Sequence, residues 1–236
     1  MKILTALVFS VLALTACDAT PDTSVSEPAA NAGVGEDVDL PEPAVSGGMS
    51  VEQALRERRS VRAYTGEPLT LVEVGQLLWA AQGVTTDWGG RTAPSAGALY
   101  PLELYVVAGA VDGLEAGVYR YEPSGHRVEG IITGDVREEL SAVSLQQESV
   151  RDGAAVFVLS GVYERTRSRY GDRAERYVHI EVGHAAQNLA LQATALGLGC
   201  VVVGSFGDDD LKDLLAMSVD ESPLYVVPVG RIGPDD

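Results

Sequence analysis

A long amphipathic segment dominates the pattern of apolar and polar positions along the chain. Between residues 174 and 196, apolar side chains recur at steps of three and four, which is the period of an α-helix. The stripe consists of Val178, Val182, Ala185, Leu189, Ala193 and Leu196. Ala186 and Ala190 widen it, so we expect a helix that is buried on more than one side and stops at Gly197.

Two shorter helices are indicated by their first turns. Ser50 with Gln53, and Thr70 with Glu73, have the spacing of capping boxes, in which side chains satisfy free backbone N–H groups. The second of these helices has one apolar stripe and ends near Gly83. The stripe consists of Leu71, Val74, Leu77, Leu78 and Ala81. A further short helix is expected over residues 210–216.

Short runs rich in β-branched residues predict the strands. Residues 102–108 and 154–162 have the length and composition of buried strands, and residues 201–203 and 224–229 predict two more. A turn at residues 123–125 separates two further segments, 118–122 and 127–132, which predict a hairpin. Because helices separate mostly non-adjacent strands, the sequence predicts an α+β fold and not a repeated βαβ array.

The first seventeen residues have the features of an export signal. Lys2 precedes an apolar run, residues 3–14, which is shorter than the ~20 residues that cross a bilayer. The run leads into Leu14-Thr15-Ala16-Cys17, which resembles a bacterial lipobox. We therefore expect a signal peptide over 1–16 and lipid attachment at Cys17, on the cell-envelope side of a bacterial membrane. An ordinary signal peptide with an incidental cysteine is the alternative.

Residues 17–48 are expected to form a disordered tether. From Asp18 to Gly48 there are seven acidic residues and four prolines, with no Lys or Arg. Such a segment has little to bury and repels itself. The remainder, residues 49–236, suits a single domain.

Charge and cysteine content exclude several classes of function. The chain has 17 Lys and Arg against 34 Asp and Glu, a net charge of −17, which argues against nucleic acid as a partner. Cys17 and Cys200 are the two cysteines, so acylation of Cys17 leaves no intrachain disulfide and no cysteine-based metal site. We also expect no metal site on the three histidines, His126, His179 and His184.

A cluster of arginines follows the first predicted helix. Arg56, Arg58, Arg59 and Arg62 lie within seven positions. Cations at a helix C-terminus complement the dipole, at ~0.3–1 kcal/mol each, and this explains one or two of them. It does not explain Ser60-Val61-Arg62, which continues past the helix end. Because guanidinium groups bind phosphate through paired hydrogen bonds, the cluster favours a phosphate site.

Three other segments add to this hypothesis. Pro94-Ser95-Ala96-Gly97, in the stretch that ends at Pro101, leaves room for a flat ring against the backbone, although it also suits an ordinary turn before a strand. Val203-Gly204-Ser205 and Pro228-Val229-Gly230-Arg231 each follow or end a predicted strand.

In this order, the four segments resemble the nitroreductase family of flavin proteins over residues 51–233. Residues 94–101 and Gly183-His-Ala-Ala-Gln-Asn-Leu189 are most similar to the branch that contains the SagB-type azoline dehydrogenases. The resemblance implies a nitroreductase-like α+β fold with a mixed central sheet and with the long helix at a homodimer interface. It also implies noncovalent FMN in a cleft built from both subunits.

The resemblance further implies roles for individual residues. The phosphate would contact Arg58, Arg59, Ser60, Arg62 and Arg231. One side of the isoalloxazine ring would contact Pro94, Ser95, Ala96 and Gly97, and its middle ring would lie near Val203 and Gly204. The implied activity is that of an FMN-dependent oxidoreductase with ping-pong electron transfer to or from a small molecule or a peptide.

Some features leave alternatives open. Where azoline dehydrogenases have a Lys-Tyr pair, this chain has Arg169-Tyr170, so Tyr170 is either a catalytic residue acting alone or a packing residue. The surrounding arginines form a solvated face or admit an anionic substrate; they are Arg165, Arg167, Arg169, Arg173 and Arg176. An exported enzyme would meet little NAD(P)H, so electrons come from the substrate or from a membrane partner. An electron-carrying flavin lipoprotein without turnover, or a module that binds another phosphate, also fits.

Overall fold

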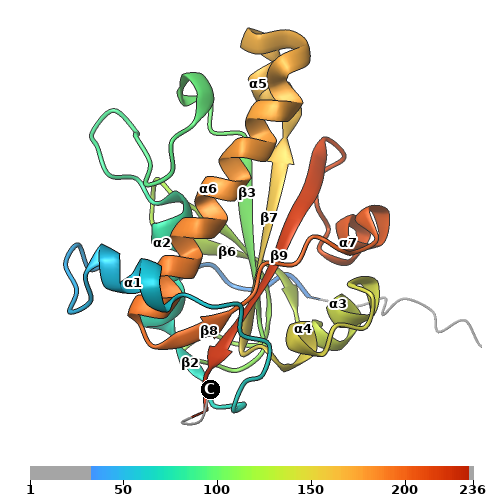
Figure 1. Cartoon of the computed structure of the whole chain (residues 1–236). Helices are drawn as coiled ribbons and strands as arrows, with labels where there is room; N and C mark the ends of the chain where they lie inside the picture. Colours follow the sequence, from blue (N-terminus) through green and yellow to red (C-terminus); the bar gives the residue numbers. More distant parts are fainter. Residues whose placement is uncertain (1–32, 234–236) are drawn as a thin grey trace, which may run out of the picture. The chain divides into compact units, whose positions relative to one another are not determined.

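A seven-stranded sheet forms the centre of the fold. The computed structural model describes residues 33–233, so the predicted signal peptide, Cys17 and the first part of the tether lie outside the described residues. The strand order is β1-β6-β5-β3-β7-β9-β8 (Figure 1). The strands are β1 Val38–Asp39, β3 Leu102–Ala108, β5 Gly117–Glu122, β6 Arg127–Thr133, β7 Ala155–Val162, β8 Leu198–Cys200 and β9 Glu221–Arg231.

All pairs within this sheet are antiparallel. Parallel pairing occurs in a separate small sheet of β2 (Leu69–Thr70) and β4 (Val111–Asp112), and at one isolated bridge between Ser60 and Cys200 of β8. The predicted α+β class is confirmed. The helices are α1 Val51–Glu57, α2 Leu71–Gln82, α3 Arg137–Val143, α4 Glu148–Asp152, α5 Tyr163–Tyr170, α6 Ala174–Ala195 and α7 Asp208–Leu214, with 3₁₀ turns η1 Ala96–Ala98 and η2 Gly171–Arg173.

Helices cover both faces of the sheet because its central strands are apolar on both sides. Along β7, Phe157 and Leu159 pack into the cluster that includes α2 and α6, while Val156 and Val158 pack with α3, α4 and α7. Successive side chains of a strand point to opposite faces, so one continuous apolar run serves two hydrophobic cores. The predicted buried strands and the hairpin of β5 and β6 are confirmed.

Helix α6 confirms the strongest prediction from the sequence. It has 22 residues and is therefore about 33 Å long. Gly197 follows its end with φ +71°, the left-handed conformation that favours glycine. One face is buried in the core, but Ile180, Gly183, His184 and Gln187 are exposed. In the single chain, the expected burial on more than one side is therefore not reached.

The capping predictions hold to different extents. At α2 the box is complete: Glu73 N donates to Thr70 Oγ1 (3.3 Å) and Thr70 N donates to Glu73 Oε2 (2.8 Å). At α1 only half forms, because Gln53 N donates to Ser50 Oγ (3.2 Å) but the Gln53 side chain turns to Glu57.

Two boundaries near the C-terminus differ from expectation. The strand predicted at 201–203 is instead β8, because the ladder with β9 ends at Cys200 and only Val203 forms a bridge further on, to Val226. Helix α7 begins at Asp208, two residues earlier than expected. Acidic side chains in its first turn complement the helix dipole there.

The prediction of a disordered tether is wrong for residues 33–48. We call residues 33–50 the N-terminal strap. Within it, Val38 pairs with Val128 of β6 and Leu40 is buried in the core. Ala44 exchanges two hydrogen bonds with the Gln76 side chain, at 2.8 and 3.1 Å. A few apolar side chains and backbone groups are enough to attach an otherwise acidic segment to the sheet and to α2.

None of the helices within residues 33–233 has the length and apolar character needed to cross a membrane.

Candidate functional site

The four clustered arginines divide into two pairs. Arg56 pairs with Glu57 (3.2 Å), and Arg59 Nη1 donates to the backbone oxygens of Arg56 (2.8 Å) and Arg58 (2.9 Å). These two serve the C-terminal end of α1, as the dipole argument expects. Arg58 and Arg62 form no ion pair with any carboxylate in the part of the chain that the structure describes. In a strongly acidic protein, they are cations left available for a ligand.

The segment that carries these arginines lies along the edge strand β8. Ser60 bridges Cys200, and Val61 N donates to Cys200 O (2.9 Å). Gly199 permits this contact, because a Cβ there would lie 2.8 Å from a Val61 methyl group. Burial raises the pKa of the Cys200 thiol to about 11 despite the opposing effect of Arg58 nearby. The thiol is therefore neutral at pH 7 and does not compete for Arg58.

Val203 and Gly204 follow on the same edge. Val203 is buried and fixed by hydrogen bonds with Val226 (2.8 and 2.9 Å), whereas Gly204 and Ser205 are exposed. Within the described residues, Gly204 N–H donates no hydrogen bond. Three residues of extended chain separate Val203 from Cys200, roughly 10 Å. The structure thus brings the arginine segment and Val203–Gly204 together on one edge of the sheet.

Arg231 is held elsewhere. Its guanidinium forms a two-pronged ion pair with Glu73, at 2.9 and 3.1 Å, and its Nε donates to Pro68 O (3.0 Å). Burial acts to raise the pKa of Glu73, but the Thr70 N–H, Arg231 and the Thr70 hydroxyl together bring it below the usual value. The expected contact of Arg231 with phosphate therefore finds no support in this geometry. Arg231 ties the last strand to the start of α2.

The Pro94–Gly97 segment forms a tight turn against the N-terminal half of α6. Gly97 has φ +66°, and Ser95 Oγ accepts a hydrogen bond from Tyr100 N (2.9 Å). A Cβ on Gly97 would lie 2.9 Å from the Tyr170 hydroxyl and 3.0 Å from Arg169 Nη1. The catalytic candidate Tyr170 therefore lies directly against this turn, with its ring edge-on to that of Tyr177.

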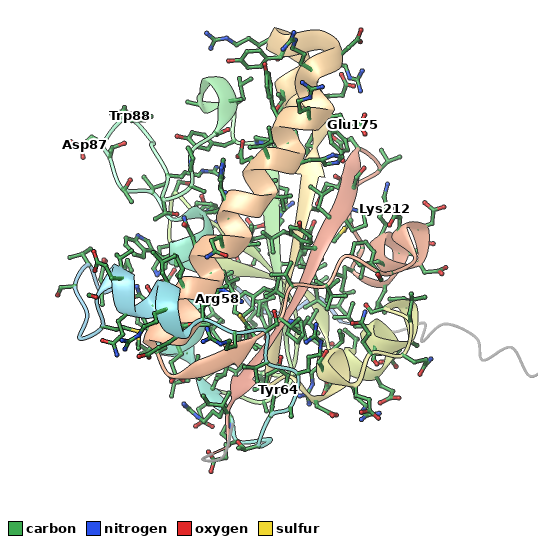
Figure 2. The ribbon with its side chains drawn as sticks, viewed as in Figure 1. Arg58, Tyr64, Asp87, Trp88, Glu175 and Lys212 are labelled. Atoms are coloured by element: carbon green, nitrogen blue, oxygen red, sulfur yellow. The ribbon has the colours of Figure 1, made fainter. Side chains whose placement is uncertain are left out.

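Helix α6 separates the turn from the arginines within one chain. Ala96 lies beside Glu181, whereas α1 packs near Ala195. These two positions on α6 are 14 residues apart, about 21 Å. In Figure 2, Glu175 marks the α5 end of α6, and Arg58 lies toward the other end of this helix. A single chain therefore assembles two parts of the predicted site but not the third.

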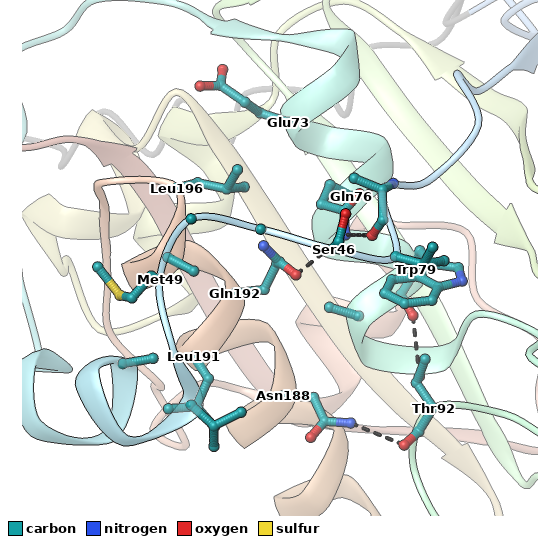
Figure 3. A pocket seen from close by; sticks show the side chains of 18 of the residues that line it. Ser46, Met49, Glu73, Gln76, Trp79, Thr92, Asn188, Leu191, Gln192 and Leu196 are labelled. Carbon is teal, nitrogen blue, oxygen red and sulfur yellow. Dashed lines mark hydrogen bonds between the residues drawn. The ribbon is translucent and has the colours of Figure 1, made fainter.

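A cavity of about 530 Å³ lies between the strap, α2 and the C-terminal half of α6 (Figure 3). Its polar lining is mainly uncharged: Gln76 Nε2 donates to Gln192 Oε1 (3.2 Å), and Asn188 Nδ2 donates to Thr92 O (3.3 Å). Glu73 is the one ionisable side chain among its lining residues, which include no Lys or Arg. This cavity does not match the phosphate end of the predicted site.

Glu181 is a candidate functional residue that the sequence pattern did not predict. Its side chain lies on the buried face of α6, with 2% exposure, and its Oε1 has no hydrogen-bond partner within the described residues. Burial raises its pKa to about 7, against the opposing effects of the Ser95 hydroxyl, Arg91 and the Ala96 N–H. The signal was present, because a glutamate stands next to Val182 and three residues after Val178 on the apolar stripe.

Two of the three histidines, His126 and His179, have structural partners. His126 contacts the Tyr121 hydroxyl (2.8 Å) and Pro41 O (3.0 Å), and His179 contacts the Tyr163 hydroxyl (2.7 Å). Across residues 33–233, no group of three His, Cys, Asp or Glu side chains is arranged to hold a metal ion.

Comparisons with known proteins agree with this architecture. The model of the Nitroreductase family matches residues 55–231. A Methanocaldococcus jannaschii protein that carries the nitroreductase name is 48% identical over 183 residues, which cover 78% of this chain and 91% of that protein. A solved structure from Ralstonia eutropha with the same family name is 30% identical, covers 86% of this chain and 93% of its own, and has a TM-score of 0.75. The microcin B17-processing protein McbC of Escherichia coli is 29% identical over 154 residues, or 61% of this chain and 56% of that protein.

Proposed function

Because this chain belongs to the nitroreductase family, an oxidoreductase family of FMN flavoproteins, we propose that it is an FMN-dependent oxidoreductase that holds its cofactor between two copies of itself. One observation carries the proposal. Arg58 and Arg62 are cations without carboxylate partners within residues 33–233, although acidic residues outnumber basic ones two to one in the whole chain. Guanidinium groups without ion-pair partners, beside the edge strand β8, are suited to bind an anion such as a phosphate.

The residues along the β8–β9 edge fit the shape of a mononucleotide. Arg58, Ser60 and Arg62 offer donors for the phosphate, and Gly204 offers a free backbone N–H roughly 10 Å further along the edge, where the ring would lie. Arg59 and Arg231 are left out of the proposed contacts because their guanidinium groups have other partners.

The third part of the site, the Pro94–Gly97 turn, would come from a second copy of the chain. The turn and α1 contact α6 at positions about 21 Å apart along the helix, so one chain does not close the site alone. The exposed face of α6 offers the contact. Ile180 is 50% exposed, and a Cβ on Gly183 would meet nothing within 4 Å, so a second helix has room to cross there.

Bound FMN supplies reversible electron transfer, and the protein supplies binding, orientation and exclusion of water. Arg58 and Arg62 would anchor the phosphate, and the Gly204 N–H would orient the middle ring. The turn of the second copy would cover one side of the ring. One open side remains, so donor and acceptor would use it in turn, which is a ping-pong sequence.

A peptide is the substrate class with specific support. McbC takes its name from the processing of microcin B17, and Tyr170 of this chain lies against the turn that would cover the ring. Tyr170 would hold or move a proton at the substrate without the lysine that azoline dehydrogenases have, because position 169 is an arginine, which does not become a neutral base. Arg169, beside Gly97, would attract an anionic group on the substrate.

We also propose export and lipid attachment at Cys17. The support is the sequence of residues 1–17, which lie outside the described residues. In bacterial cells, Cys17→Ser should move the protein from the membrane fraction to the soluble fraction. A variant that stays with the membrane would contradict lipidation.

Absorbance of the purified full chain tests the proposed function. We expect flavin bands in the visible spectrum, release of FMN on denaturation, and bleaching when a donor is added without oxygen. A colourless chain that binds no added FMN would overturn the proposal. Bound FMN that no donor or peptide reduces would favour an electron carrier without small-molecule turnover.

A further inference from the structure

A cluster of polar side chains, among which Glu181 and Gln82 are buried, lies beneath the Pro94–Gly97 turn. Glu181 of α6 lies beside Ser95 and Ala96, and its carboxyl oxygen Oε1 has no hydrogen-bond partner within the described residues. Arg91 contributes to the same environment, and its Nη1 donates to Gln82 Oε1 (2.9 Å). Burial of a carboxyl group with an oxygen that has no hydrogen-bond partner costs folding free energy. Such a group is retained where it has a role toward its neighbours.

The turn above this cluster has an unfavourable backbone. After Gly97, Ala98 has φ +54° and Tyr100 has φ +46°. Residues with a Cβ adopt the left-handed region at a cost of roughly 1 kcal/mol or more each. Such a conformation persists only where its surroundings hold it.

Hydrogen bonds connect the strained residues to Ser95 and Arg91, the two residues that act on Glu181. Tyr100 N donates to Ser95 Oγ (2.9 Å), and Arg91 N donates to the Tyr100 hydroxyl (3.3 Å). The Arg91 guanidinium lies 4.5 Å from the centre of the Tyr100 ring. Because Ser95 Oγ accepts from Tyr100, its own proton is free to point toward the Glu181 carboxyl.

Few charges act on this carboxyl. Arg91, from the segment after α2, is the charged side chain that acts on it. Glu103 of β3 and Arg165 of α5 act on Arg91 and pair with each other. Gln82 of α2 and Ser95 of the turn are uncharged. Glu181 is therefore the group beneath the turn whose charge changes with pH.

We propose, on the premise that this turn covers the ring of FMN, that Glu181 is a positioning residue whose negative charge holds Ser95 and Ala96 in the ring-binding arrangement. An ionised carboxylate accepts from both the Ser95 hydroxyl and the Ala96 N–H. Protonation weakens both bonds and releases the strained turn. Since burial raises the pKa of Glu181 to about 7, the turn is held above neutrality and loosens below it.

The affinity of the FMN-free full chain for FMN, measured by flavin fluorescence from pH 5.5 to 8.5, tests the proposal. We expect the wild type to bind about three- to tenfold more weakly at pH 6 than at pH 8, as release of one proton allows. Glu181→Gln removes the charge but keeps the shape of the side chain. The affinity of this variant for FMN should therefore not fall between pH 8 and pH 6 in the way expected for the wild type. The phosphate of FMN also titrates near pH ~6, but equally for every variant.

Glu175→Gln is the matched control, because Glu175 lies on the same helix but is exposed. It should reproduce the wild-type profile. An identical profile in Glu181→Gln and the wild type, or a flat profile in Glu175→Gln, would overturn the proposal.

Hydrogen exchange at the Ala96 amide of the wild type gives a second readout that needs neither a variant nor FMN. After correction for the intrinsic rate, protection should fall as the pH drops from 8 to 6, and constant protection would refute the role of Glu181. A wild type that binds no FMN at any pH would instead overturn the proposed function, and the exchange result would still decide the positioning role.

Discussion

At the residue scale, the arginines are distinguished by their partners and not by their spacing. Arg56 and Arg59 are occupied at the end of α1, and Arg231 is occupied by Glu73. Arg58 and Arg62 have no carboxylate partner within residues 33–233. The sequence shows where positive charge gathers, but only the fold shows which guanidinium groups already have partners.

Arg231→Ala should lower stability without changing FMN content. Loss of the two-pronged pair with Glu73 should reduce the free energy of unfolding by about 1–2 kcal/mol at pH 7. The pKa of Glu73 is lowered in the fold, so this stabilisation is present above the pKa of the unfolded chain and is lost as the pH falls through the folded value. In urea titrations, the difference between wild type and variant should therefore shrink below pH ~4. Unchanged stability together with lost FMN would return Arg231 to the phosphate site.

At the element scale, features that depend on neighbouring residues were predicted correctly from the sequence. Features that depend on contacts with distant residues were not. The Thr70–Glu73 capping box and the stop at Gly197 depend on neighbouring residues, and both are confirmed. The strap was missed because its composition is that of a disordered segment, while its order depends on β6 and α2, more than thirty positions away.

The candidate site shows the same limit. The arginine segment and Val203–Gly204 are far apart in sequence but adjacent on the edge of the sheet, as the resemblance implied. The partner of Arg231 lies 158 positions away, so no local pattern reveals it. Glu181 was overlooked because a charged residue on a helix is normally solvated. Its position on the apolar face of α6, beside Val182, nevertheless places it in the core.

Gly183→Leu tests the exposed face of α6. Leucine favours helix over glycine by roughly 0.8 kcal/mol, and the space beside Gly183 is open, so the single chain should fold at least as well. A leucine at the crossing point should nevertheless block a second helix, which gives a monomer in analytical ultracentrifugation that retains little FMN. Gly183→Ala is the milder control and should remain dimeric. A fully dimeric Gly183→Leu protein would place the interface elsewhere.

At the scale of the whole molecule, the proposed site needs two chains, and complementation reveals this. Chains with Arg58→Ala and Arg62→Ala have a defective phosphate end, and chains with Gly97→Val have a distorted turn next to Tyr170. Neither should hold FMN alone. Co-expression should restore about one quarter of the wild-type content, since half of randomly formed dimers are mixed and each has one intact site. Mixed dimers without FMN would show that one chain supplies both parts.

The dissociation constant for FMN in single arginine variants tests the central claim most directly. Removal of Arg58 or Arg62 should each weaken binding by about tenfold or more, since each loses a charge-assisted contact worth roughly 1.4 kcal/mol or more. Arg59→Ala removes the same charge from the same segment and should change the constant by less than about twofold, because Arg59 serves the end of α1. If Arg58→Ala and Arg62→Ala bind FMN as tightly as the wild type, these two arginines do not hold the phosphate and the account is contradicted.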